Sequence, residues 1–229
     1  MGFQTVLQLT LPLSAVLIAL STISIILTIH YWAVADFVVT RWIPMPSEFP
    51  EKNRFPIDDV IIDYSGTNTT ATVISGFLNL AAGLMAIIAW KKLKGRQMDT
   101  DFHAPLRRFY VAVVFILGIA GACAAIAAFA TRYTNKGNDK YGCTRTTDKT
   151  VGLGQPFTNL LCTTEMGVCN FAFPFSTGKG RGWANQACTE TIVVKWLQIV
   201  LLLDVVIIMG MFAWQARQRR TTRGLREVK

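Results

Sequence analysis

The chain has 229 residues, 52% of them hydrophobic, and its mean hydropathy is +0.37; an ordinary soluble domain is ~45–50% apolar. The formal net charge is +9, but the basic residues do not gather on one segment, which argues against a nucleic-acid-binding surface. The chain holds two histidines and shows neither a Walker motif nor a Ser–His–Asp or Cys–His set. We therefore expect no enzymatic activity, no cofactor, no metal and no nucleic-acid partner.

Four apolar runs account for the hydrophobic excess. Each is close to the ~20 residues with which a helix crosses a ~30 Å hydrocarbon layer. None carries the polar stripe of a water-soluble helix. We expect transmembrane helices at 9–32, 71–90, 109–130 and 191–214. The predicted fold is an all-α membrane protein, in which a bundle of four transmembrane helices carries a disulfide-bonded extracellular loop.

Charge predicts the orientation of these helices. Residues 91–108 carry six basic and two acidic side chains, and the tail 215–229 carries six basic and one acidic. Because short basic segments stay in the cytoplasm, both termini should lie inside, with residues 1–8 as the N-terminal segment. Residues 33–70 and 131–190 then form extracellular loops. The tail sequence RQRRTTRGLR either sets topology alone or also contacts anionic lipid headgroups.

The first extracellular loop contains two short features of interest. VIIDY (60–64) has the composition of a strand and could join the second loop in a small extracellular β-sheet. Asn68 begins an Asn-Thr-Thr sequon, a candidate glycosylation site that lies almost on the second predicted helix.

Small residues recur at helical spacing in the second and third runs. Gly76, Asn79 and Gly83 share one helical face, and Gly118 and Gly121 share another. In lipid, helices meet through small residues and polar contacts. We expect these positions to pack against neighbouring helices.

Four of the five cysteines lie in the second extracellular loop, at Cys143, Cys162, Cys169 and Cys188. An extracellular location favours two disulfides. Four cysteines allow three pairings. We prefer the nested one, Cys143–Cys188 around Cys162–Cys169, because it ties the two stems of the loop. A zinc site is disfavoured, since the loop has no Cys-x-x-Cys and no histidine.

The same loop contains a group of aromatic side chains. FAFPF (171–175) contributes Phe171, Phe173 and Phe175, and Trp183 follows shortly afterwards. These side chains either cover a small core or form an exposed contact patch for a partner.

Asp204 interrupts the fourth run, about 18 Å from its outer end at ~1.5 Å per residue. An acid exposed to lipid at that depth costs ~2.5–3.5 kcal/mol. We therefore expect Asp204 to face the bundle interior, with Asn79 as a polar neighbour. Three roles fit: a polar clamp between helices, capture of a polar group on a partner's helix, or relay of protons or ions.

Four spans, internal termini and a larger second outer loop with four cysteines resemble the layout of tetraspanins, and more loosely that of claudin and MARVEL proteins. The resemblance lies in topology, since all four cysteines stand singly and the first outer loop has none. It implies a non-enzymatic scaffold or accessory subunit in the plasma membrane or secretory pathway. The expected partners are membrane lipids and either another integral membrane protein or a second copy.

Two other functions are compatible with the sequence. The first is a small transporter, channel or ion-coupled sensor that uses Asp204. The second is a cell-surface or junction protein that associates with itself through FAFPF and Trp183.

Overall fold

The computed structural model describes residues 3–46, 57–94, 103–148 and 157–227. The chain folds into two compact units, and each long helix contributes a segment to both of them. The bundle unit comprises Met1–Ile25, Thr72–Ala127 and Leu197–Lys229. The disulfide unit comprises Ile26–Ala71 and Ala128–Trp196.

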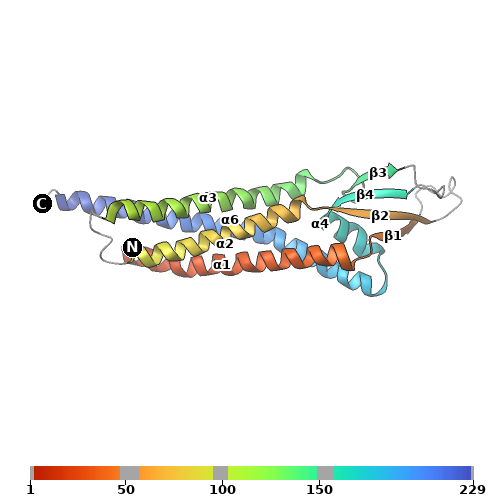
Figure 1. The fold of residues 1–229 in the computed structure, drawn as a ribbon, viewed down its shortest axis with the longest axis horizontal. Helices are drawn as coiled ribbons and strands as arrows, with labels where there is room; N and C mark the ends of the chain where they lie inside the picture. Colours follow the sequence, from red (N-terminus) through yellow and green to blue (C-terminus); the bar gives the residue numbers. More distant parts are fainter. Residues whose placement is uncertain (1–2, 47–56, 95–102, 149–156, 228–229) are drawn as a thin grey trace. The chain divides into compact units, whose positions relative to one another are not determined.

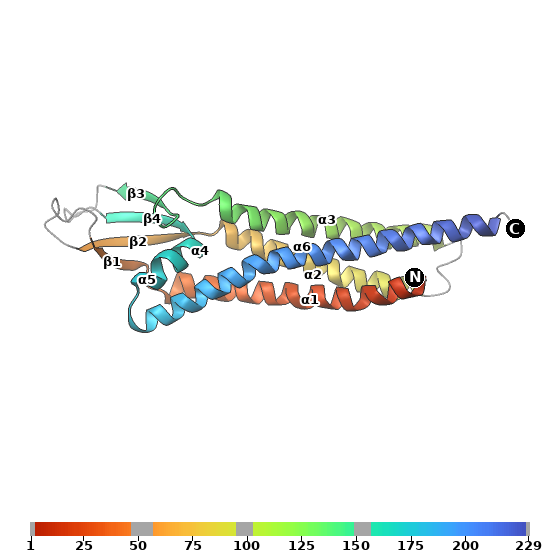
Figure 2. The same cartoon turned by 180° about the vertical axis from the view of Figure 1, so that it is seen from behind.

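Four long helices run side by side through the bundle unit (Figures 1 and 2). They are α1 (Phe3–Ala33), α2 (Thr67–Leu93), α3 (Ala104–Thr134) and α6 (Gly178–Glu227). Each includes a stretch long and apolar enough to cross a membrane, and each of the four predicted runs lies inside one such stretch. The stretches are Gln8–Val38, Thr67–Leu93, Ala104–Thr134 and Gly178–Gln218. The prediction of a four-helix fold is confirmed.

The buried positions of all four helices follow an alternating spacing of three and four residues. This is the 3.5-residue period of left-handed helix packing, in which one narrow stripe of each helix faces its neighbours. In α1 the stripe comprises Thr10, Ser14, Leu17, Ser21, Ser24, Thr28 and Tyr31. In α2 it comprises Asn68, Thr72, Ser75, Asn79, Ala82, Ala86, Ala89 and Leu93. In α3 it comprises Val114, Gly118, Gly121, Ala125, Ala128 and Arg132. In α6 it runs from Ala184 to Gln215 through Val194, Gln198, Leu201, Val205, Ile208 and Phe212.

The outward positions of these helices carry large apolar side chains, whereas the buried stripes carry many small or polar ones. Ile26 of α1, Ile116 of α3 and Leu203 of α6 are 60%, 65% and 57% exposed. In water this arrangement would leave the hydrophobic surface unburied, but in hydrocarbon it matches the solvent and keeps the polar groups inside. The distribution therefore fits a bundle surrounded by lipid.

The disulfide unit contains a four-stranded sheet with the order β1-β2-β4-β3 (Figure 1). Strands β1 (Trp42–Pro46) and β2 (Ile57–Ser65) precede α2, and β3 (Thr144–Asp148) and β4 (Phe157–Thr163) follow α3. β2 pairs with β4 in parallel, while β1 pairs with β2 and β3 pairs with β4 antiparallel. The predicted sheet between the segments that join the helices is confirmed, and the strand expected at 60–64 lies within β2.

Short helical turns cover one face of this sheet. They are η1 (Val34–Val38), α4 (Thr164–Met166), η4 (Gly167–Ala172) and α5 (Phe173–Phe175). Alternate side chains of the strands point to one face, where Val60, Ile62 and Leu160 pack with Phe171. Burial raises the pKa of Tyr64, on the same face, above its usual range, so this hydroxyl carries no charge in the core.

Candidate functional site

A chain of hydrogen bonds joins all four helices inside the bundle unit. Gln198 of α6 donates to the Ser24 hydroxyl of α1 at 3.0 Å, and its carbonyl accepts from the Ser75 hydroxyl of α2 at 2.8 Å. Asn79 of α2 donates to the Ser75 carbonyl at 3.0 Å and to the Gly121 carbonyl of α3 at 3.5 Å. We call these five residues the interhelical polar network. Since each side chain is fully buried or nearly so, the network holds the four helices in a single register.

Gln198 completes this network but was not predicted from the sequence. Glutamine is a weak signal inside a long apolar run, because it carries no charge and one residue barely lowers the hydropathy. The spacing of Gln198 in the sequence could have predicted its position. Gln198 stands on the same 3.5-residue stripe as Val194 and Leu201, so the helical period alone places it toward the other helices.

The four glycines expected at helix contacts each lie against a side chain of another helix. Ile25 and Ile18 of α1 occupy the space beside Gly76 and Gly83 of α2. Met209 of α6 lies beside Gly118 of α3, and the Asn79 amide of α2 lies beside Gly121 of α3. A methyl group built on any of the four would come within 2.5–2.8 Å of those atoms. Their lack of a side chain therefore permits the close approach of α2 to α1, of α3 to α6, and of α2 to α3.

Asp204 is buried, with 7% of its surface exposed, as its position in an apolar run required. One of its carboxylate oxygens, Oδ2, is buried without a hydrogen-bond partner. The expected contact with Asn79 does not form, because the Asn79 amide nitrogen is engaged by Ser75 and Gly121. Asp204 also stands beside the buried stripe, next to Val205, and not on it. The interhelical clamp of this bundle is therefore built on Gln198 and not on Asp204.

The four cysteines of the second predicted loop form two disulfides, but our preferred nested pairing was wrong. The bonds are Cys143–Cys162 and Cys169–Cys188, with Cα–Cα distances of 4.5 and 4.9 Å. The reason for the first pair is strand register. Thr144 of β3 pairs with Leu161 of β4, so the antiparallel ladder brings the preceding Cys143 opposite Cys162.

Peptide mapping of the non-reduced protein tests this pairing. Cleavage after glutamate, lysine and arginine separates all four cysteines. We expect YGCTR linked to the peptide that ends in CTTE, and MGVCNFAFPFSTGK linked to GWANQACTE. The nested pairing would instead join YGCTR to GWANQACTE, an outcome that would contradict the β3–β4 register.

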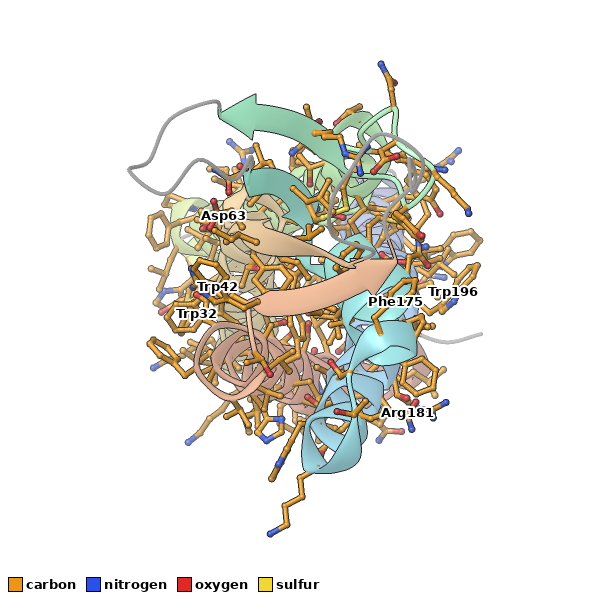
Figure 3. The ribbon with its side chains drawn as sticks, turned by 90° about the vertical axis from the view of Figure 1, so that its right-hand side faces the viewer. Trp32, Trp42, Asp63, Phe175, Arg181 and Trp196 are labelled. Atoms are coloured by element: carbon orange, nitrogen blue, oxygen red, sulfur yellow. A yellow bond between two sulfur atoms is a disulfide. The ribbon has the colours of Figure 1, made fainter. Side chains whose placement is uncertain are left out.

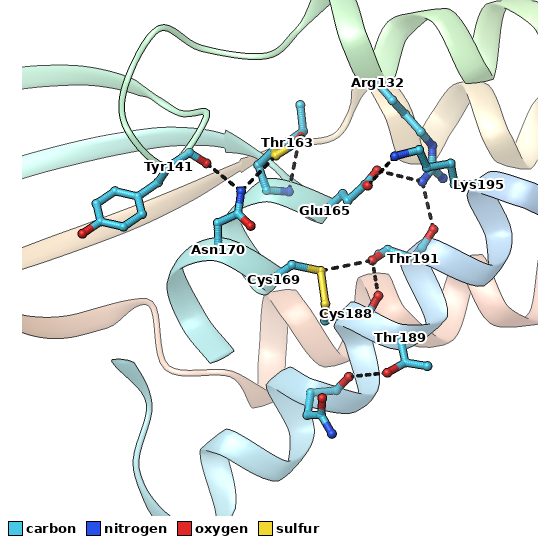
Figure 4. Close-up of a disulfide and its surroundings, with 12 residues drawn as sticks. Arg132, Tyr141, Thr163, Glu165, Cys169, Asn170, Cys188, Thr189, Thr191 and Lys195 are labelled. Carbon is cyan, nitrogen blue, oxygen red and sulfur yellow. Dashed lines mark hydrogen bonds and ion pairs between the residues drawn. A yellow bond between two sulfur atoms is a disulfide. The ribbon is translucent and has the colours of Figure 1, made fainter. Parts of the chain in front are cut away.

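A buried ion triad of Arg132, Glu165 and Lys195 lies next to the second disulfide (Figure 4). Glu165 of α4 accepts from Lys195 of α6 at 2.8 Å and from Arg132 of α3 at 3.4 Å. Arg132 also donates to the carbonyl of Thr191 at 3.0 Å, and the Lys195 ammonium lies 5.1 Å from the ring centroid of Tyr133. The Lys195 ammonium therefore contacts both an acid and an aromatic ring.

The ion triad and the Cys169–Cys188 disulfide attach the segment between β4 and α6 to two long helices. Cys169 of η4 is bonded to Cys188 of α6, and the Cys169 sulfur lies 4.0 Å from the hydroxyl of Thr191. Glu165, three residues after Cys162, contacts both α3 and α6. Covalent and ionic links thus hold the same short segment, which fixes the surface of the disulfide unit.

The aromatic residues of FAFPF belong to the core of the disulfide unit. Phe171 is fully buried and contacts Tyr141 and Phe175, with ring centroids 5.4 Å apart in both pairs. Phe173 is partly buried and packs on the same core. Trp183, in contrast, is 42% exposed. Of the two arrangements expected for these side chains, the FAFPF residues adopt the small core, in which Phe171 faces inward as part of the covering over the sheet, and only Trp183 remains largely exposed.

Asn68 lies in the first turn of α2 and is 4% exposed. A glycan needs its asparagine side chain at the surface, so the folded state argues against the use of this sequon.

No metal centre is evident in the described ranges. Within residues 3–46, 57–94, 103–148 and 157–227, no three His, Cys, Asp or Glu side chains are placed to hold a metal ion. An open pocket of about 390 Å³ lies in the disulfide unit, where Lys136, Asp139 and Arg145 are among its lining residues. The side chains from residue 219 onward, with the basic lipid-contact sequence, lie outside the described residues, as does the segment 95–102 of the basic loop.

No protein-family model, no curated protein and no solved structure matches this chain.

Proposed function

We propose that the protein is a non-enzymatic integral membrane scaffold or accessory subunit that binds and organises partner membrane proteins. In this proposal the four apolar helices anchor the chain in the plasma membrane or secretory pathway, with both termini in the cytoplasm. The disulfide unit lies outside and binds the partner. The topology is then that of a tetraspanin-like protein.

One observation carries this proposal: the two segments between the helices combine into one cross-linked unit. β2 comes from the segment between α1 and α2, and β4 from the segment between α3 and α6, yet they pair along six residue positions. The Cys143–Cys162 disulfide then links β4 to the loop before β3, and the Cys169–Cys188 disulfide and the ion triad join the covering turns to α3 and α6. A unit held so firmly pays little ordering entropy when it binds, which favours recognition by a preformed surface.

The orientation is supported by charge and by disulfide chemistry. Basic residues follow the second and fourth apolar runs, at 91–108 and 215–229, and basic flanks are retained in the cytoplasm. All four bonded cysteines come between the third and fourth apolar runs in the sequence. With the basic flanks in the cytoplasm, this segment would lie in an oxidising compartment, where disulfides form.

The two alternatives find less support in the contacts. A conduction pathway through Asp204 would use Asn79 as its neighbour, but Asn79 is held by Ser75 and Gly121. Self-association through FAFPF would need Phe171 at the surface, but Phe171 lies in the core.

Purification in mild detergent followed by quantitative mass spectrometry tests the proposal. We expect wild-type protein to retain a stoichiometric membrane-protein partner. A variant with Cys169→Ser and Cys188→Ser should lose it, because the partner-binding surface is then no longer fixed. Trp214→Ala, on the exposed part of α6 in the bundle unit, is the matched control and should retain the partner. If the wild-type protein purifies as a lone monomer under every gentle condition, the scaffold function fails.

A further inference from the structure

Four large apolar side chains of the disulfide unit form an exposed group, which we call the aromatic patch. Trp32, Phe37, Trp42 and Leu161 are 39%, 77%, 53% and 50% exposed. Trp32 and Phe37 contact each other edge to face, with ring centroids 5.9 Å apart. In Figure 3, Trp32 and Trp42 lie next to each other on the same side as Asp63, whereas Phe175, Arg181 and Trp196 lie on the other side.

The sheet explains why two of these side chains point outward. Val60, Ile62 and Leu160 face the core, so the alternate residues of the same strands face away from it. On that outer face Trp42 pairs with Ile61, and Leu161 of β4 pairs with Asp63 of β2. Trp42 and Leu161 lie on strands outside the four apolar stretches. Contact with hydrocarbon therefore does not account for their exposure, and a protein surface is the better match.

The charges beside the aromatic patch have a pattern that can complement itself. Arg41 pairs with Asp36 at 2.9 Å, and its second contact, to Asp63, is longer at 3.8 Å. Arg41 and Asp63 are both accessible, since 42% and 53% of their side-chain surfaces are exposed. One copy thus presents a cation and a loosely held acid side by side. A second copy that faces it presents the same pair in the opposite order.

We propose that the aromatic patch is a self-association surface, with a second copy of this chain in the same membrane as its partner. Two copies inserted with one orientation are related by rotation about the membrane normal. A two-fold axis along that normal then brings the same patch of both copies together. Trp42 and Leu161 of the two copies pack at the centre, where aromatic anchors contribute most to binding. Arg41 of each copy pairs with Asp63 of the other at the rim.

This inference names one partner for the proposed scaffold and rests on that function only for the outward location of the disulfide unit. Energy transfer between donor- and acceptor-labelled copies of the full chain, in phosphatidylcholine vesicles over a range of protein-to-lipid ratios, measures the association. We expect saturable transfer for the wild type. Trp42→Ala should weaken the association at least tenfold, whereas Trp183→Ala, an equally large exposed truncation on α6, should leave it unchanged.

Charge exchange provides the sharper test. D63R alone places Arg41 against an arginine in the symmetric pair, and R41D alone places Asp63 against an aspartate. Each variant by itself should associate at least tenfold more weakly than the wild type. A mixture of R41D and D63R copies should associate as the wild type does, because both cross-pairs are then opposite in charge. If R41D does not fold, three single variants carry the test, namely D63R, Trp42→Ala and L161D, and each should weaken the association.

Three outcomes would overturn the inference. Transfer at the random level for the wild type means that the copies do not associate. Saturable transfer that neither D63R nor Trp42→Ala weakens means that they associate elsewhere. Transfer that requires anionic lipid means that the patch binds the membrane surface. None of these outcomes removes a different partner found by gentle purification, so the self-association surface can fail while the proposed scaffold function stands.

Discussion

Replacement of Glu165 by glutamine is expected to lower the free energy of unfolding of the disulfide unit by about 3–5 kcal/mol. Glu165 is the acid that both Arg132 and Lys195 contact, and the side chains of those two bases are only 4% and 16% exposed. Without the carboxylate, two like charges remain close together and away from water. The cost arises from the charges left behind and not from the value of the ion pairs themselves.

Equilibrium unfolding in mixed detergent micelles, followed by tryptophan fluorescence, measures this loss. Glu190→Gln is the matched control, because Glu190 pairs with His30, whose side chain is 43% exposed. A contact of that exposure contributes about 1 kcal/mol or less, even between two charged groups. Replacing all three members of the ion triad by apolar side chains of similar size should restore most of the stability. A Glu165→Gln variant as stable as Glu190→Gln would show that the triad is solvated in the folded protein.

The helices could be predicted from the sequence because the information for them is local. A continuous apolar run of about twenty residues has few ways to satisfy its backbone other than as a membrane helix. The 3.5-residue period was also present in the sequence, in Ser14, Leu17, Ser21 and Ser24 for example, but small and polar residues mark it and hydropathy does not detect them. The same period would have separated Gln198, on the stripe, from Asp204, beside it.

The disulfide pairing could not be predicted because it depends on contacts between distant parts of the chain. Cys143 meets Cys162 only once β3 lies antiparallel on β4 with Thr144 opposite Leu161. The position of β4 depends in turn on its parallel pairing with β2. That strand precedes both α2 and α3 in the chain. Loop geometry suggested a bond between the two stems, whereas strand register decided the actual pairs.

Phe171 and Trp183 show that the burial of side chains also could not be predicted from the sequence. Both are aromatic residues of one predicted loop, and neither composition nor spacing distinguishes them. Phe171 lies in the turn η4 over the sheet and is buried, whereas Trp183 lies on α6 and is 42% exposed. Burial in such a segment is decided by what covers it, which neither composition nor spacing reveals.

Replacement of Asp204 by valine is expected to stabilise the bundle unit by about 1–3 kcal/mol, because it removes a buried polar group that lacks a hydrogen-bond partner. Valine is only slightly larger than aspartate, so the packing beside Val205 should change little. The matched variant is Gln198→Leu on the same helix, which should lower the free energy of unfolding. It leaves the Ser24 and Ser75 hydroxyls without their glutamine, at a cost of about 1–2 kcal/mol. The same unfolding measurement in mixed micelles compares the two.

The opposite signs would separate the two polar residues of α6 by role. Gln198 is satisfied at both ends, so its removal should loosen the register of α6 against α1 and α2 at once. Asp204 has one buried oxygen without a partner, and an acid that weakens the bundle around it is retained for something other than stability. If Asp204→Val is more stable yet loses the partner that the wild type retains, the acid acts in assembly. If Asp204→Val is less stable than the wild type, the Asp204 carboxylate accepts hydrogen bonds in the membrane, and its Oδ2 atom does not lack a partner there.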